Sequence, residues 1–420
     1  MKDREEIMVV QALTKDENKF VLLEGIHPSA VETLKSAGYN NIEYHKGALS
    51  KSELKDVLKD ARFIGIRSRT HLTKDIIDAA PKLAGIGCFC IGTNQVELEA
   101  ATVKGIPVFN APFSNTRSVA ELVLAEAILL LRRVPEANAR AHQGKWNKIA
   151  TGSHEARGKN LGIIGYGHIG SQLSVLAESL GMNVYFYDIE TKLPLGNAKQ
   201  IATMKELLAM SDIVSMHVPE NATTIKMIGK SEIDMMKSGA ILLNASRGSV
   251  IDIDALTQAL EANKLSGAAI DVFPTEPASN SDPFESPLCK FDNVIITPHI
   301  GGSTSEAQEN IGIEVATKLA KYSDTGATLS AVNFPKAALP IPAKGSSRFI
   351  NIHHNQPGVL TAINTLFAEQ GLNISAQYLQ TDPLIGYVVI DIDRVEQSKA
   401  EELLVKLKNV NGTIRARLLF

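Results

Sequence analysis

Short apolar runs alternate with amphipathic segments along the first quarter of the chain. Apolar residues three and four positions apart lie on one face of a helix, whereas short apolar runs are typical of buried strands. The pattern predicts strands at 20–23, 42–44, 63–67, 83–87 and 108–110. It predicts helices at 30–37, 52–58, 74–80 and 96–103. Because strands that alternate with helices pair in parallel, residues 1 to about 112 are predicted to form a first α/β domain.

A strand, a glycine turn, a helix and a second strand are predicted between residues 160 and 188. Gly165, Gly167 and Gly170 have the G-x-G-x-x-G spacing at the start of the helix. Such glycines allow a tight turn and let the backbone approach a pyrophosphate, which the helix N-terminus faces. Asp188, 18 positions past the last glycine, can accept hydrogen bonds from ribose hydroxyls and would repel a 2′-phosphate. The pattern therefore predicts a Rossmann-type domain that binds NAD rather than NADP.

A long apolar helix is predicted before this motif, and further strands are predicted after it. Ser118 with Glu121 predicts a capping box for a helix that is apolar almost all round at 119–131. Such a helix must be buried against a neighbouring domain or a second subunit. The later strands of the dinucleotide-binding domain are predicted at 213–217, 240–244, 268–273 and 294–297.

A glycine pair, Gly301 and Gly302, follows the last of these strands. Ser303 with Glu306 then predicts a second capping box, for a helix that runs to about Lys321. Glycines beside a long helix suit a hinge where the chain returns from the nucleotide-binding domain to the first domain.

The C-terminal part of the chain is predicted to be a separate unit. Residues 337–347 contain proline, glycine and serine without periodicity, which indicates a linker. Beyond it, strands are predicted at 349–353, 374–379, 387–392 and 413–419, and helices at 359–370 and 399–408. The order βαββαβ predicts a ferredoxin-like sandwich.

Composition and charge restrict the function classes. The chain has 420 residues, enough for about three domains of ordinary size. Its 43 basic and 46 acidic residues give a net charge of −3, which argues against nucleic acid and anionic membranes as partners. Three cysteines are too few for a disulfide framework, and the charged N-terminus lacks the apolar core of a signal peptide. We therefore expect a soluble, cytoplasmic protein with reduced thiols and no metal ion.

Three polar residues stand just beyond predicted strands of the dinucleotide-binding domain: Arg247, Glu276 and His299. Ligands of open parallel sheets bind at these strand ends, next to the cofactor. An arginine grips a carboxylate with two hydrogen bonds, and a histidine accepts a hydroxyl proton near neutral pH. A carboxylate on the other imidazole nitrogen orients the ring and stabilises its protonated form. Together the three residue types suit the dehydrogenation of a 2-hydroxy acid.

The motifs GYGHIG, NASRG, GAAIDVFPTEP and TPHIGGST, within residues 20 to 335, resemble those of the D-isomer-specific 2-hydroxyacid dehydrogenases. The resemblance implies an NAD-dependent oxidoreductase in which Arg247, Glu276 and His299 are catalytic. It also implies that the cofactor contacts are Gly165, Gly167, His168, Ile169, Gly170, Asp188, Ala245, Ser246, Arg247, Asp271, His299, Gly301 and Gly302.

Four basic residues, Lys46, Arg67, Arg69 and Lys148, match substrate-holding positions in members of this family that oxidise D-3-phosphoglycerate. The product of that reaction is 3-phosphohydroxypyruvate, and the reaction is the first step of L-serine biosynthesis. A substrate with a phosphate and a carboxylate carries about three negative charges, so several cations in one cleft suit it. The resemblance therefore implies a phosphorylated substrate, 3-phosphoglycerate.

The C-terminal unit resembles an ACT domain over its whole length, through IHHNQPG and GLN. This implies feedback inhibition by serine, bound by His353, Asn355 and Asn373, and the family resemblance favours a homotetramer. Two features depart from the pattern. The N-terminus is longer, and the linker has one glycine, Gly345, in place of a pair.

The chain is thus predicted to have three domains, all of them α/β. These are a flavodoxin-like substrate-binding domain (1–114 and 303–340), a Rossmann-type NAD-binding domain (115–302) and a ferredoxin-like ACT regulatory domain (348–420). Two alternatives stay open. One is a dehydrogenase of an unphosphorylated acid such as glyoxylate or lactate, and the other is an NAD-sensing corepressor or scaffold on the same fold.

Overall fold

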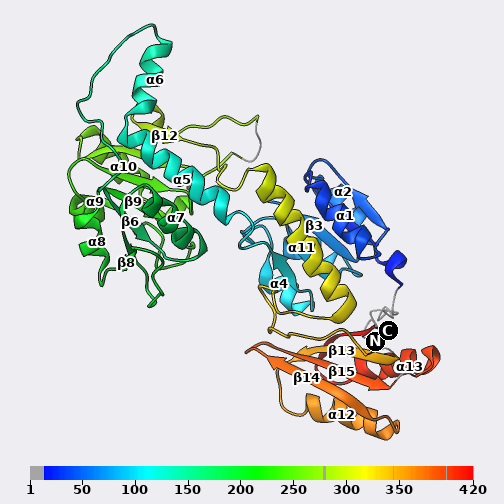
Figure 1. The fold of residues 1–420 in the computed structure, drawn as a ribbon. Coiled ribbons are helices and arrows are strands. Elements are labelled where there is room, and N and C mark those ends of the chain that lie inside the picture. The colour runs from blue at the N-terminus through cyan, green and yellow to red at the C-terminus, as the bar shows by residue number, and fades with distance from the viewer. Residues whose placement is uncertain (1–13, 278–280, 344, 394, 420) are drawn as a thin grey trace. The chain divides into compact units, whose positions relative to one another are not determined.

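The structure is a computed structural model of the chain, and it describes residues 14–277, 281–343, 345–393 and 395–419 (Figure 1). The chain divides into two compact units. The first unit comprises residues 1–112 and 308–420, and the second comprises residues 113–307. Each unit is described by itself.

The first sheet of the first unit is parallel, with the strand order β2-β1-β3-β4-β5. Leu34 of α1 and Leu319 of α11 belong to the core on one face, and Leu58 of α2 and Ile76 of α3 belong to the core on the other. This is the flavodoxin-like order with helices on both faces, as predicted. The strands are β1 (Phe20–Leu22), β2 (Ile42–Tyr44), β3 (Phe63–Ile66), β4 (Gly85–Cys88) and β5 (Val108–Asn110). The helices are α1 (Pro28–Ser36), α2 (Lys51–Leu58), α3 (Lys74–Asp78), α4 (Leu98–Val103) and α11 (Ser305–Thr325).

The second sheet of the first unit is antiparallel, with the order β14-β15-β13-β16. Its two helices pack on one face, where Phe367 and Leu404 join the core. On the other face, Ile350 and Tyr387 share a core with the first sheet. The βαββαβ prediction is confirmed. The elements are β13 (Ser346–His354), α12 (Val359–Glu369), β14 (Ile374–Thr381), β15 (Ile385–Asp393), α13 (Gln397–Lys408) and β16 (Thr413–Leu419).

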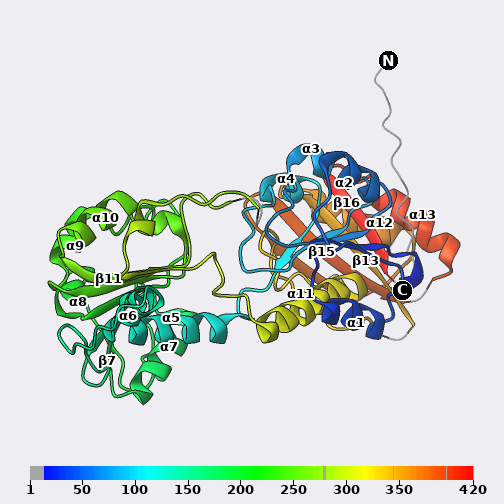
Figure 2. The ribbon, with the colours of Figure 1, turned by 90° about the horizontal axis from the view of Figure 1, so that it is seen from above.

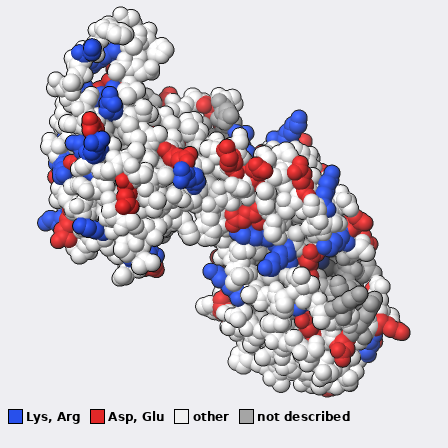
Figure 3. Space-filling model, viewed as in Figure 1, with Lys and Arg blue, Asp and Glu red and all other residues white. Residues whose placement is uncertain are grey.

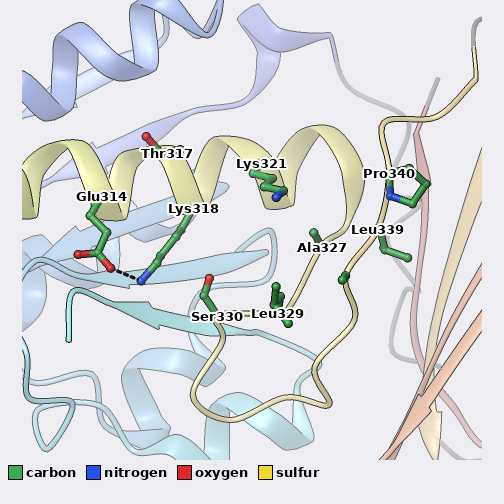
Figure 4. Close-up of a pocket in the computed structure, with 10 residues that line it drawn as sticks. Glu314, Thr317, Lys318, Lys321, Ala327, Leu329, Ser330, Leu339 and Pro340 are labelled. Atoms are coloured by element: carbon green, nitrogen blue, oxygen red, sulfur yellow. Dashed lines mark hydrogen bonds and ion pairs between the residues drawn. The ribbon is translucent and has the colours of Figure 1, made fainter. Parts of the chain in front are cut away.

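The predicted linker has no helix or strand before β13 among its described residues, but its first residues are held in place. Thr328 donates its backbone N–H to the Ala337 carbonyl at 3.0 Å, and its hydroxyl oxygen accepts the Ala337 N–H at 3.1 Å. A cavity of about 590 Å³ lies between α11 and this segment (Figure 4). In it, Lys318 Nζ donates to the Glu314 carboxylate at 2.6 Å.

The sheet of the second unit is parallel, with the order β12-β11-β10-β9-β6-β7-β8. One core holds Leu173 of α7 and residues of α5, and the other holds Leu207 of α8 and Leu256 of α10 (Figure 2). This is the predicted Rossmann-type arrangement. The strands are β6 (Asn160–Ile164), β7 (Asn183–Tyr187), β8 (Lys199–Gln200), β9 (Ile213–Met216), β10 (Ala240–Asn244), β11 (Leu265–Ile270) and β12 (Val294–Ile296). The helices are α5 (Thr116–Leu131), α6 (Val134–His142), α7 (His168–Ser179), α8 (Met204–Met210), α9 (Lys230–Met235) and α10 (Ile253–Glu261).

Both predicted capping boxes are wrong. Helix α5 begins at Thr116, so Ser118 lies inside it, and its hydroxyl is 2.7 Å from that of Thr304. Thr304 is also the residue that caps α11, because its hydroxyl accepts the backbone N–H of Ala307 at 3.1 Å. At α11 the neighbouring Thr304 takes the capping position, whereas at α5 the N-cap is Asn115, three residues before Ser118.

The apolar helix α5 is only partly buried within its own unit. Val119, Val123 and Ala127 are in the core, whereas Leu129 remains 38% exposed. Across the face shown in Figure 3, acidic and basic side chains are interspersed, as the near-neutral net charge suggests. Among the described residues, no helix combines the length and apolarity needed to cross a membrane.

Candidate active site

The glycine turn between β6 and α7 requires glycine at two of its three positions. Gly165 has a φ of 92°, and a Cβ there would lie 2.4 Å from the His217 carbonyl oxygen. A Cβ at Gly170 would lie 2.3 Å from the Gly165 oxygen, so helix and strand could not approach. Around Gly167, at the start of α7, a Cβ would meet no atom within 4 Å. The open space at a helix N-terminus fits a phosphate group that the backbone N–H groups bind.

Asp188 follows β7 and faces the same turn. Its Oδ2 accepts the backbone N–H of Tyr166 at 2.8 Å, and its Oδ1 accepts that of Glu190 at 3.0 Å. A carboxylate has further lone pairs for ribose hydroxyls. Ile189, the next residue, is 91% exposed, which is unusual for a large apolar side chain. These residues fit the ribose and adenine of a dinucleotide.

His168 and Ile169, two predicted cofactor contacts, begin helix α7. The His168 ring is exposed, with its centre 4.0 Å from that of Phe113. Ile169 is half-buried. Both therefore lie beside the open space at Gly167.

His299 and Glu276 form an imidazole–carboxylate pair. His299 Nδ1 lies 2.9 Å from Glu276 Oε2, and the backbone N–H of Phe273 donates to Glu276 Oε1 at 3.2 Å. The hydrogen bond to Glu276 raises the pKa of His299 above its usual value, against the opposing effect of burial. Burial alone would raise the pKa of Glu276, but the hydrogen bond from His299 and its charge bring it below its usual value. Because a carboxylate only accepts, Nδ1 carries the proton and Nε2 is free to accept another.

The loop that carries His299 is held by Asp271, which is 1% exposed. The Asp271 carboxylate accepts the Thr297 hydroxyl at 2.6 Å and the backbone N–H groups of Ile300 and Gly301, both at 2.8 Å. The His299 backbone N–H donates to the Asp271 carbonyl at 2.8 Å. His299 itself has a backbone φ of 54°, which residues other than glycine rarely adopt. The loop is therefore held in a strained conformation that presents the imidazole.

The glycine pair that follows packs closely against its surroundings. A Cβ at Gly301 would lie 3.0 Å from Asp271 Oδ2, and one at Gly302 would lie 2.6 Å from Asn115 Nδ2. Close packing explains why glycine stands at these two positions. Their predicted roles as a hinge and as cofactor contacts stay predictions.

Arg247 follows β10, and its guanidinium Nη1 donates to the Ser246 carbonyl at 2.7 Å. Asn244 organises this turn, because its side-chain oxygen accepts both the N–H and the hydroxyl of Ser246, at 3.0 and 2.7 Å. Strands β10, β11 and β12 are parallel neighbours in the sheet. Arg247, Glu276 and His299 follow these strands in the chain, so all three stand beyond the carboxyl ends of the strands. The positive charge of Arg247 contributes to lowering the pKa of both other residues. The predicted trio is thus brought together.

Three of the four predicted substrate-binding cations lie on adjacent loops of the first unit. Glu24, buried and with a φ of 62°, accepts the backbone N–H groups of Arg67 at 3.1 Å and Arg69 at 2.9 Å. The Glu24 backbone N–H in turn donates to the Gly47 carbonyl at 3.0 Å, next to the exposed Lys46. Glu24 thus joins the loops that follow β1, β2 and β3, through its carboxylate to the loop after β3 and through its backbone N–H to the loop after β2.

The fourth cation, Lys148, belongs to the second unit. It lies in an exposed segment after α6, near Trp146, which is 92% exposed. Ala245, half-buried, completes the predicted cofactor set at the end of β10.

The predicted serine-binding residues do not form one site within a single chain. His353 is buried, with Nδ1 3.0 Å from the Asn351 side-chain oxygen, and burial lowers its pKa. Asn355 donates to the Asp382 carbonyl at 2.7 Å, just past the end of β14. Asn373, exposed, precedes the start of β14. The eight residues of β14 separate the two asparagines by roughly 26 Å at ordinary strand rise.

Sequence reasoning missed Glu24, Ile189 and the loop-holding role of Asp271. Each had a signal. Glu24 and Ile189 stand two positions past the ends of β1 and β7, as an acid after an apolar run and as an apolar residue after an acid. Asp271 directly follows β11, which β10 and β9 separate from the strand of the glycine turn, and a buried carboxylate at that position needs partners.

Comparisons with known proteins identify the family of the chain. Residues 124–301 match the D-isomer specific 2-hydroxyacid dehydrogenase NAD-binding domain, and residues 349–415 match an AHAS small subunit-like ACT domain. D-3-phosphoglycerate dehydrogenase of Escherichia coli (strain K12) is 66% identical over 413 residues, 98% of this chain and 100% of that protein. D-3-phosphoglycerate dehydrogenase 1 of Saccharomyces cerevisiae is 46% identical over 423 residues, 98% of this chain and 90% of that protein. The crystal structure of Aquifex aeolicus D-lactate dehydrogenase with NAD and lactic acid aligns with a TM-score of 0.65 and 27% identity, covering 76% of this chain and 100% of that one. The chain belongs to the D-isomer-specific 2-hydroxyacid dehydrogenases, NAD-dependent oxidoreductases, and includes an ACT domain.

Proposed function

We propose that the chain oxidises D-3-phosphoglycerate to 3-phosphohydroxypyruvate with NAD, the first step of L-serine biosynthesis. The observation that carries the proposal is the pairing of His299 with Glu276 beyond the same sheet edge as Arg247. The high identity to relatives named for this reaction supports the choice of substrate.

In this reaction the substrate loses a proton from its 2-hydroxyl and a hydride from the same carbon. NAD, when bound, accepts the hydride. His299 accepts the hydroxyl proton on Nε2, because Nδ1 is already engaged by Glu276. Glu276 stabilises the doubly protonated ring that results. Arg247 binds the substrate carboxylate with its planar fork and so orients the carbon that is oxidised.

The residues around the glycine turn are assigned to the dinucleotide. Asp188 accepts hydrogen bonds from the adenine ribose, and Ile189 covers the adenine ring with an apolar surface. Gly167 with the first residues of α7 binds the pyrophosphate. Ala245, Ser246, Asp271 and the glycine pair line the path toward the nicotinamide.

Recognition of the phosphate group is assigned to Lys46, Arg67, Arg69 and Lys148. Support comes from the way the Glu24 carboxylate fixes the backbone of the loop that carries Arg67 and Arg69. We assign substrate binding to residues 1–114 and 303–340, NAD binding to 115–302 and regulation to 348–420.

Serine is proposed as the effector of the ACT domain, bound between two copies of the chain. Strand β14 is an exposed edge strand. Antiparallel pairing of two such edges about a two-fold axis would bring Asn355 of one copy next to Asn373 of the other. A second contact through the exposed segment around Trp146 would complete a homotetramer. The proposed location is the cytoplasm.

A panel of substrates tests the proposal. NAD reduction is measured with D-3-phosphoglycerate, D-lactate, D-glycerate and 2-hydroxyglutarate at equal concentrations. The proposal predicts the highest kcat/KM for 3-phosphoglycerate. Preference for an unphosphorylated acid would contradict the substrate assignment, and failure to turn over any acid while NAD still binds would favour a corepressor or scaffold.

A further inference from the structure

Three arginines meet where the ACT sheet faces the first sheet of its unit. Arg62 directly precedes β3, and Arg415 and Arg417 alternate along β16, so that the latter two point to the same face. Arg62 is 6% exposed and Arg417 is 3% exposed. Arg415 reaches the neighbouring domain, because its Nη1 donates to the Leu83 carbonyl. The three side chains are therefore gathered at one domain junction.

These guanidinium groups have few partners. Arg62 makes one long hydrogen bond, from Nη1 to the Lys82 carbonyl at 3.4 Å. The Arg417 guanidinium lies over the ring of Tyr322, 4.7 Å from its centre. Buried Arg62 Nε and Arg417 Nε and Nη1 have no hydrogen-bond partner. Within the part of the chain that the structure describes, no carboxylate forms an ion pair with any of the three.

By contrast, the charge of a neighbouring buried arginine is compensated by a carboxylate. Arg348 is fully buried and forms a two-pronged ion pair with Asp391, at 2.6 and 2.7 Å. Its remaining nitrogen donates to the carbonyls of Thr325 and Pro340. Each nitrogen of that guanidinium has a hydrogen-bond partner, which is the ordinary state of a buried charge.

The uncompensated cluster is electrostatically unfavourable as it stands. Burial, followed by the charges of Arg417 and Arg415, lowers the pKa of Arg62 to about 9. Burial likewise lowers the pKa of Arg415 to about 10. Several positive charges that repel one another, with N–H groups unbonded, are the environment that an anion would stabilise.

We propose that Arg62, Arg415 and Arg417 bind a small oxyanion, a phosphate group or its equivalent, at the junction of the ACT and substrate-binding domains. The Nε and Nη1 of Arg417, which have no hydrogen-bond partner, supply two donors for oxygens of the anion. The Nε of Arg62 supplies a third donor from the other domain. The anion therefore joins β16 to the start of β3 and strengthens the contact between the two domains.

Inorganic phosphate is the probe, and the full-length chain is used throughout. Thermal unfolding and calorimetric titration are measured in phosphate and in chloride at equal ionic strength. We expect phosphate to raise the unfolding temperature more than chloride does. Arg417→Gln and, independently, Arg62→Gln should weaken phosphate binding about thirtyfold or more, the loss typical of a truncated buried charge contact. Arg117→Gln, on an exposed arginine of α5, is the matched control and should leave binding unchanged.

The active site could also take phosphate, so Arg67→Ala is included. Phosphate stabilisation that persists in this variant but is lost in the Arg417 variant supports the junction site, whether or not the proposed substrate is right. Stabilisation that Arg67→Ala abolishes would overturn it.

A second control concerns the terminal carboxylate of the chain. Phe420 lies outside the described residues, and a variant extended beyond it by a short Gly-Ser tail moves the α-carboxylate away from this position. Phosphate binding that occurs only in the extended chain would overturn the proposal in favour of the chain's own carboxyl terminus as the anion.

Discussion

Replacing Glu276 with glutamine should separate the orienting carboxylate from the base that it supports. The amide keeps the size of the side chain and can still accept a hydrogen bond from His299 Nδ1. It removes the negative charge that raises the pKa of the imidazole. The substitution therefore leaves the base in place but deprives its protonated form of a counter-ion.

The size of the effect follows from the geometry of the pair. The two atoms are 2.9 Å apart, but the side chains are 54% and 37% exposed, so water screens the interaction. Hydrogen bonds to charged groups contribute about 1.5–3 kcal/mol, and exposure favours the lower end. Since about 1.4 kcal/mol corresponds to tenfold in rate, we expect a loss of roughly tenfold in kcat.

The pH dependence gives the second readout. In the direction of oxidation His299 must be neutral to accept a proton, so the rate rises as pH rises through its pKa. Without Glu276 that pKa falls, and the rise in kcat/KM should move to lower pH. NADH absorbance with 3-phosphoglycerate is followed across neutral and alkaline pH. Glu261→Gln, which removes an exposed carboxylate paired with Lys290, is the control. A profile that stays in place, or moves to higher pH, would refute the proposed role of Glu276.

Three further substitutions test cofactor, substrate and effector. Asp188→Ala should weaken NAD binding and relax the exclusion of NADP, and an unchanged ratio of kcat/KM for the two cofactors would contradict the ribose assignment. Arg67→Ala should reduce kcat/KM for 3-phosphoglycerate far more than for D-lactate; equal losses would mean that Arg67 serves the fold. Asn355→Ala should abolish inhibition in a serine titration while leaving uninhibited turnover nearly unchanged, with a coupling of about 1–3 kcal/mol lost. A wild-type chain indifferent to millimolar serine would leave the ACT domain without its proposed effector.

Much of the fold could be predicted because local pattern and tertiary context agree. β2, β5, β10 and β16 have the predicted bounds. β11 was predicted at 268–273 but lies at Leu265–Ile270. Its small residues carry little strand signal, and the chain leaves the sheet at Asp271 because that carboxylate binds the next loop.

The residue types of the candidate site could be predicted, but the contacts that hold these residues in place could not. The strand ends identified Arg247, Glu276 and His299, since polar residues there have no structural reason to follow apolar strands. The strained φ of His299 and of Glu24 depends on contacts with residues far along the chain, which no local pattern contains. For the same reason, only the structure shows that Asn355 and Asn373 lie at opposite ends of one strand.

The most direct test of the account is the turnover of the His299→Ala variant, measured together with its affinity for NAD. The account predicts that kcat for 3-phosphoglycerate falls by about 10²–10⁴, the range for a lost general base. NAD affinity should stay close to that of the wild type, because the glycine turn and Asp188 are untouched. His142→Ala, which removes an exposed imidazole on α6, should retain full activity. Near-normal turnover by the His299 variant, with NAD bound as tightly as before, would contradict the central claim that this imidazole accepts the substrate proton.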